Sequence, residues 1–145
     1  MRNGASCAGK VWPMDELHPE RTELRVPYRD IDMHGRMHTA AYIEHAEEAL
    51  ARFWQYRPEV ENEPAYVVRK VGCTFYRGLK NGETADLVVR AAKIGGKSIG
   101  FNVAVQAGNH IAAEVELLWT AVNRVNGEPA PLPEATRDWL FSFLD

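Results

Sequence analysis

The side chains best suited to chemistry gather in one short stretch, residues 28–45, which reads YRDIDMHGRMHTAAYIEH. Two aspartates, Asp30 and Asp32, stand shortly before Gly35. A carboxylate can act near neutral pH as a general base or as a nucleophile. Residue type alone does not single out Asp32, and taken by itself it is expected to be a solvated turn residue or a cap on the approach to a helix. Asp30 is expected to hydrogen-bond the backbone of the turn, as aspartate commonly does.

The histidines of this stretch raise the question of a metal site. His34 and His38 are four residues apart, a spacing that would suit a metal ion if both lay on one helix. Gly35 interrupts such a helix and no third ligand is evident, so no metal site is predicted. His45 borders the apolar stripe of the helix that follows, and it is expected to pack there rather than to bind a ligand.

An amphipathic helix is predicted directly after the turn, over residues 39–54. Its apolar residues have the i, i+4, i+7, i+8, i+11 spacing of a single buried stripe, namely Tyr42, Ala46, Ala49, Leu50 and Phe53. Thr39 is the expected N-cap, because its hydroxyl can accept a hydrogen bond from the first turn. The unpaired N–H groups and the positive dipole end of a helix start would also stabilise an oxyanion.

Most of the remaining chain has the alternation of β-strands. A first strand is expected over residues 22–28, four more over 65–76, 85–94, 99–106 and 111–121, and a short helix over 134–143. Turn signals such as Asn81-Gly82 separate the later strands, which predicts antiparallel neighbours joined by short turns. A single helix would cover one face of that sheet. The long strands near 65–76 and 110–124 would leave an open edge in a monomer, so we expect at least a dimer.

Length and composition limit the class of protein. The 145 residues suffice for one domain, with residues 1–20 expected as a loose N-terminal arm and residues 21–145 as the domain. A formal net charge of -3 argues against a nucleic-acid partner. No run is long and apolar enough to span a membrane, and Cys7 and Cys73 form no CxxC motif. We expect a cytoplasmic protein without a membrane partner.

The sequence resembles the hotdog-fold acyl-CoA thioesterases of the 4-hydroxybenzoyl-CoA thioesterase type. The resemblance covers about residues 22–131 and rests on Tyr28-Arg29-Asp30-Ile31-Asp32, then Gly35, then Tyr42, followed by the order of strands. It implies an α+β hotdog fold, in which an antiparallel sheet of about five strands wraps one long central helix and a short C-terminal helix follows. It also implies a homodimer or homotetramer and an acyl-CoA substrate, without a separate cofactor.

The same resemblance implies roles for individual residues at the helix start. Asp32 would attack the thioester carbonyl or direct water at it. The backbone N–H of Thr39 would stabilise the oxyanion. The chain departs from the family pattern at Arg36, His38 and Thr39, and this departure makes His38 a candidate for orienting water or the acyl carbonyl. The acyl group would be fatty or aromatic.

Substrate binding is expected to involve Tyr42, Lys97 and Ser98. In the benzoyl-CoA relative a basic cluster before a serine serves the nucleotide of CoA, and Lys97-Ser98 falls at the corresponding place, although glycines precede it here. Two other functions stay open. One is a hotdog dehydratase or hydratase, which would pair a histidine with an acidic residue, as His38 with Asp32. The other is a non-catalytic module that binds acyl-CoA.

Overall fold

The computed structural model describes residues 18–145 and shows a sheet with two helices. In chain order the elements are β1 (Arg21–Arg25), the short 3₁₀ helix η1 (Tyr28–Asp30), α2 (Thr39–Trp54), β2 (Ala65–Phe75), β3 (Thr84–Ile94), β4 (Ser98–Ala107), β5 (His110–Val122) and α3 (Glu134–Phe141). Cys7 and nearly all of the expected N-terminal arm lie outside the described residues. No helix within residues 18–145 is long and apolar enough to cross a membrane.

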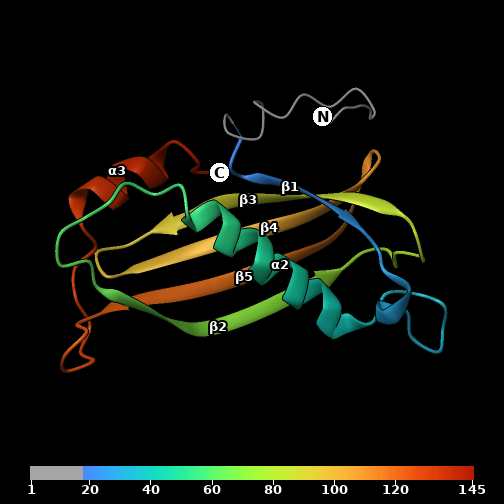
Figure 1. Cartoon of the computed structure of the whole chain (residues 1–145), viewed down its shortest axis with the longest axis horizontal. Coiled ribbons are helices and arrows are strands. Elements are labelled where there is room, and N and C mark those ends of the chain that lie inside the picture. The colour runs from blue at the N-terminus through green and yellow to red at the C-terminus, as the bar shows by residue number, and fades with distance from the viewer. Residues whose placement is uncertain (1–17) are drawn as a thin grey trace.

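The strands form one antiparallel sheet in the order β1-β3-β4-β5-β2 (Figure 1). Strands β3, β4 and β5 follow one another through short turns, but β2 lies beyond β5, with Phe75 opposite Ala113. The prediction that short turns join four strands that are neighbours in the sheet was therefore wrong for β2 and β3, which are consecutive in sequence but not adjacent in the sheet. The segment with Asn81-Gly82 connects these two strands across the end of the sheet.

The edges of the sheet also differ from the expectation. Strand β5 pairs with β4 on one side and with β2 on the other, so the expected open edge at residues 110–124 was wrong. The edge strands are β1 and β2 (Ala65–Phe75), so the expected open edge at residues 65–76 is confirmed. Strand β1 ends at Arg25, earlier than predicted, since Pro27 has no backbone N–H to continue the ladder.

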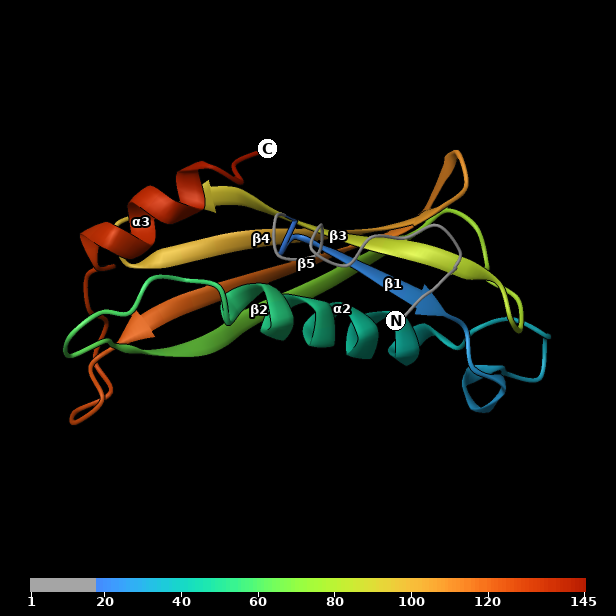
Figure 2. The same ribbon diagram turned by 45° about the horizontal axis from the view of Figure 1, so that its top comes forward.

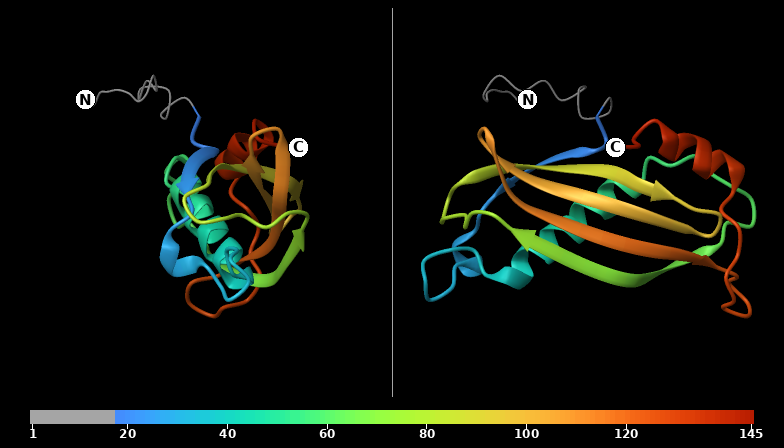
Figure 3. Two further views of the ribbon diagram at one scale, coloured as in Figure 1. Left: turned by 90° about the vertical axis from the view of Figure 1, so that its right-hand side faces the viewer. Right: turned by 180° about the vertical axis from the view of Figure 1, so that it is seen from behind.

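Helix α2 runs along one face of the sheet, and the sheet curves around it (Figures 2 and 3). The residues of α2 buried against the sheet are Ala41, Tyr42, Ala46, Ala49, Leu50 and Phe53, which confirms the predicted apolar stripe. Ala46 and Ala49 are almost fully buried; small side chains there let the helix lie close to the strands. This is the hotdog arrangement that the sequence implied.

Aromatic rings fill the space between the C-terminal half of α2, the sheet and α3. Phe53 stacks on Trp139 of α3 with ring centroids 4.7 Å apart, and it meets Phe143 edge-on at 5.0 Å. Trp54 contacts Tyr66 and Trp119 edge-on at 5.0 and 5.1 Å. Such pairs add to the stability that burial alone provides. They anchor the end of α2 that lies away from Asp32.

Candidate active site

The turn that carries Asp32 is a closed hairpin between η1 and α2. The N–H of Asp32 donates to the carbonyl of Arg36 at 2.8 Å, and Ile31 forms an antiparallel bridge with Met37. Gly35 has a φ of 80°, a left-handed conformation that glycine adopts without steric cost. The hairpin is thus set by local sequence, and it leads directly into the helix.

The Asp32 carboxylate is accessible to solvent and is held by its own turn. One oxygen, Oδ1, accepts hydrogen bonds from the N–H groups of His34 at 2.8 Å and Arg36 at 3.2 Å. These two amides lower the pKa of Asp32 below its ordinary value of 3.8. Within residues 18–145 no group hydrogen-bonds the other oxygen, Oδ2. The carboxylate is therefore ionised at neutral pH, and one of its oxygens is open to a ligand.

The helix starts with His38 as its N-cap, not with Thr39 as the sequence predicted. His38 has an extended backbone, and its Nδ1 accepts from the N–H of Ala41 at 3.2 Å. Because Nδ1 is the acceptor, the proton of the neutral ring is assigned to Nε2. Among the described residues, the N–H groups of Thr39 and Ala40 meet no acceptor. These two amides point from the positive end of α2, where an anion is stabilised.

Asp30 behaves differently from the turn residue that was expected. Its side chain is buried and meets Nε2 of His45 in α2 at 2.8 Å, with the two side chains only 9% and 15% exposed. Its backbone carbonyl accepts from the N–H of His38 at 2.8 Å. The expected hydrogen bond from the Asp30 side chain to the turn backbone was wrong, because the carboxylate faces the helix. Sequence reasoning missed this pair, whose members are 15 positions apart.

Tyr42, an expected substrate-binding residue, is buried beneath the turn and only 2% exposed. Its hydroxyl oxygen accepts from the N–H of Leu79 at 3.0 Å, and its ring meets Phe75 edge-on with centroids 5.2 Å apart. The carbonyl of Leu79 in turn accepts from Met37 at 2.8 Å. Tyr42 therefore joins α2, the turn and the loop that follows β2.

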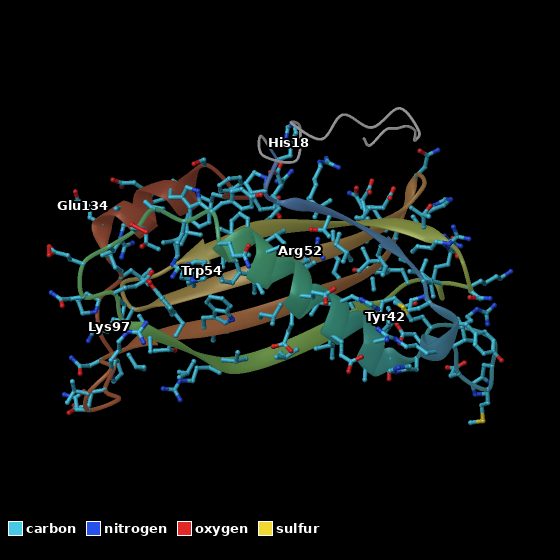
Figure 4. The ribbon with its side chains drawn as sticks, in the orientation of Figure 1. His18, Tyr42, Arg52, Trp54, Lys97 and Glu134 are labelled. Carbon is cyan, nitrogen blue, oxygen red and sulfur yellow. The ribbon has the colours of Figure 1, made fainter. Side chains whose placement is uncertain are left out.

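Lys97 and Ser98 lie far from this turn within one chain. Figure 4 shows Lys97 near the end of the sheet beyond Trp54, whereas Tyr42 lies toward the opposite end of α2. The 16 residues of α2 span roughly 24 Å at 1.5 Å per residue. The structure brings together Asp32, His38, Thr39 and Tyr42 but not Lys97 and Ser98. Among the residues it describes, no three histidine, cysteine or acidic side chains are grouped for a metal ion.

Comparisons with known proteins identify the family and the fold of this chain. The family model of the thioesterase-like superfamily matches residues 26–140, most of the chain. The chain belongs to this superfamily. The protein is accordingly a thioester hydrolase with the hotdog fold. The resemblance to the hotdog-fold thioesterases that the sequence indicated is confirmed. No curated protein matches it in sequence.

Several solved structures are similar to the thioesterase over nearly their whole length. A thioesterase of Thermus thermophilus, complexed with coenzyme A and Zn, is 26% identical with a TM-score of 0.75, covering 87% of this chain and 94% of that one. The PA5185 protein of Pseudomonas aeruginosa is 17% identical with a TM-score of 0.76, covering 90% and 94%. A Staphylococcus aureus protein in complex with CoA is 15% identical with a TM-score of 0.76, covering 87% and 85%.

Proposed function

We propose that the thioesterase hydrolyses a fatty or aromatic acyl-CoA, with Asp32 as its catalytic carboxylate. One observation carries the proposal: the open oxygen of Asp32 belongs to a turn that leads directly into the unpaired amides of α2. The CoA complexes of the Thermus thermophilus and Staphylococcus aureus proteins support CoA as the thiol portion of the substrate.

The reaction needs a base or nucleophile on one side of the thioester carbonyl and hydrogen-bond donors on the other. Asp32 either removes a proton from the attacking water or attacks the carbonyl itself, giving a mixed anhydride that water then opens. The amides of Thr39 and Ala40 receive the negative charge that develops on the carbonyl oxygen. The C–S bond breaks, CoA leaves as the thiolate and takes up a proton, and the acyl group leaves as the carboxylate.

His38 contributes through the nitrogen that the N-cap leaves free. Its Nδ1 is occupied by Ala41, so Nε2–H is the group that can donate to water or to the acyl carbonyl. This arrangement supports a helper role. It gives no support to a dehydratase or hydratase, in which a histidine would have to accept a substrate proton. Such an enzyme would also pair the histidine with an acidic residue, and His38 makes no hydrogen bond to Asp32.

The CoA nucleotide requires cations, and a second copy of the chain supplies them in our proposal. Lys97 and Ser98 are too far from Asp32 to share one active site within a chain. They could meet the same CoA only if they came from different copies. The substrate would then lie between two chains of a homodimer, the smallest homo-oligomer that completes the site.

The edge strand β2 is the surface that supports such a dimer. Val68, Val71 and Phe75 are 47%, 39% and 46% exposed. Phe75 contacts Tyr42 of α2, so Phe75 and Val71, four positions before it, face the helix side of the sheet. Exposed apolar side chains on an edge strand favour association, and pairing with a second β2 would cover them.

Replacement of Asp32 by asparagine tests the catalytic assignment. Asparagine keeps an oxygen that accepts from His34 and Arg36 but removes the charge, the basicity and the nucleophilicity. With a panel of acyl-CoA esters and a thiol reagent, kcat should fall about 10²-fold to 10⁴-fold, the usual range for losing a general base.

The matched control is Asp138→Asn, at an aspartate of α3 outside the proposed site, which should hydrolyse the same esters at the parental rate. Parental activity of Asp32→Asn would remove Asp32 from the chemistry. If the parental protein releases no thiol from any ester of the panel, the acyl-CoA substrate itself is wrong, and binding measured with the same panel would then indicate a non-catalytic module.

A further inference from the structure

The buried pair of Asp30 and His45 has no role in the reaction as proposed so far. Asp30 is one of two acidic residues that are buried among the described residues; the other is Glu20. Removing a carboxylate from water is costly unless it is paired and hydrogen-bonded. The chain places it 2.8 Å from the His45 imidazole, which supplies this partner.

We infer that Asp30 and His45 are a positioning pair that sets the Asp32 carboxylate against the unpaired amides of α2. The inference rests on the proposed function, since it gives the pair its effect through Asp32. Neither residue touches the substrate in this view. Each fixes a part of the backbone whose placement the reaction needs.

The hydrogen bonds of Asp32 do not fix its place relative to the helix. Both of its amide donors, His34 and Arg36, belong to the same hairpin. They hold the carboxylate rigidly within the hairpin, but the hairpin as a whole could still tilt over the start of α2. Contacts that cross from the hairpin region to the helix must prevent this tilt.

Asp30 makes two of these contacts. Its carbonyl accepts from the N–H of His38, the N-cap, and its carboxylate binds His45, seven residues further along α2. Seven residues are about two helical turns, so one residue is fastened to the helix at two points about 10 Å apart along its axis. Two separated attachments resist rotation in a way that the N-cap bond alone does not.

The other side of the hairpin is held independently. Met37 donates to the carbonyl of Leu79, and the N–H of Leu79 donates to the hydroxyl of Tyr42. Asp32 lies between these two attachments along the chain. When the Asp30–His45 contact is lost, the Leu79 side remains as a hinge, and the expected result is a displaced carboxylate in a folded protein.

His45→Leu and His45→Gln test the inference as a matched pair. Leucine fills the space but cannot bind Asp30, whereas the glutamine amide can place an N–H near the position of Nε2. A misplacement of about 1 Å can cost on the order of 10²-fold in rate, so His45→Leu should lower kcat about 10-fold to 100-fold. KM should stay within about twofold, because binding away from the reacting bond is unchanged. His45→Gln should recover most of kcat.

A double variant separates positioning from general damage. If His45 acts through Asp32, then adding His45→Leu to Asp32→Asn should lower the residual kcat by less than about twofold, because residues that act as a unit are not additive. Thermal melting and size measurements verify that each variant is folded. Should His45→Leu not fold, His45→Asn, whose amide is too short to reach Asp30, replaces it in the same comparison.

Three results would overturn the inference: an unchanged kcat in folded His45→Leu, an equal loss in His45→Gln, or a loss that multiplies fully with that of Asp32→Asn. The first two results are read in the parental background, and the third is read only where Asp32→Asn itself lowers kcat. That function is judged by Asp32→Asn alone, in the parental background.

Discussion

Replacement of Tyr42 by phenylalanine probes the contact between α2 and the loop that follows β2. The ring stays in place, so apolar burial is conserved and only the hydroxyl is lost. Its oxygen accepts from Leu79, whose side chain is fully buried. A buried N–H left without a partner costs about 1–3 kcal/mol. For a chain of this size roughly 4 °C of melting temperature corresponds to 1 kcal/mol, so Tm should fall by about 4–12 °C.

The assay combines thermal melting with steady-state hydrolysis of an acyl-CoA. The buried geometry predicts a lower Tm with KM unchanged, whereas a tyrosine that binds substrate would give a higher KM with Tm unchanged. Tyr56→Phe is the control, because Tyr56 is 47% exposed and should lose neither stability nor activity. A Tm of Tyr42→Phe within about 1–2 °C of the parental value would refute the energetic reasoning.

Three other predictions concern the site and the edge strand. The two amides lower the pKa of Asp32 below its ordinary value of 3.8. The charged, active form should therefore persist as pH falls, and kcat/KM should decline only below that value. A decline of kcat/KM at about pH 6.5, the pKa of free histidine, would contradict this. If two copies of the chain pair through the edge strand β2, Val71→Lys, which adds a charge on the helix side of that strand, should reduce the mass measured by light scattering to that of one chain, 16.3 kDa. An unchanged mass would exclude pairing through this part of β2. Lys97→Ala should raise KM by a factor that shrinks as salt increases, with kcat unchanged; an unaltered KM would exclude Lys97 from the nucleotide site.

Periodic patterns made the helix predictable, because every turn of α2 repeats the same requirement for an apolar side chain. The stripe from Tyr42 to Phe53 could be read directly. Strand positions were also close, since alternation and turn residues mark them locally. The place of β2 in the sheet was not predictable in this way: Asn81-Gly82 is a turn signal whether the strands on either side of it are neighbours or lie at different edges.

The site shows the same division between local and distant information. The Asp32 turn follows from a glycine and an aspartate within a few positions of each other. The N-cap was assigned to the wrong residue because both His38 and Thr39 carry an acceptor, and backbone conformation decides between them. The Asp30–His45 contact joins residues on opposite sides of the N-cap, and no spacing rule covers a pair formed by the path of the chain around a helix end.

The position of β2 at the far edge has a consequence for synthesis. Strands β3, β4 and β5 can pair as soon as each is synthesised, because they are neighbours in sequence and in the sheet. Phe75 must wait for Ala113, 38 residues later (113 − 75). At about 5–20 residues per second, the ribosome needs roughly 2–8 s to supply that partner. During this interval β2 has no partner strand, so two nascent chains on one message could pair with each other through β2.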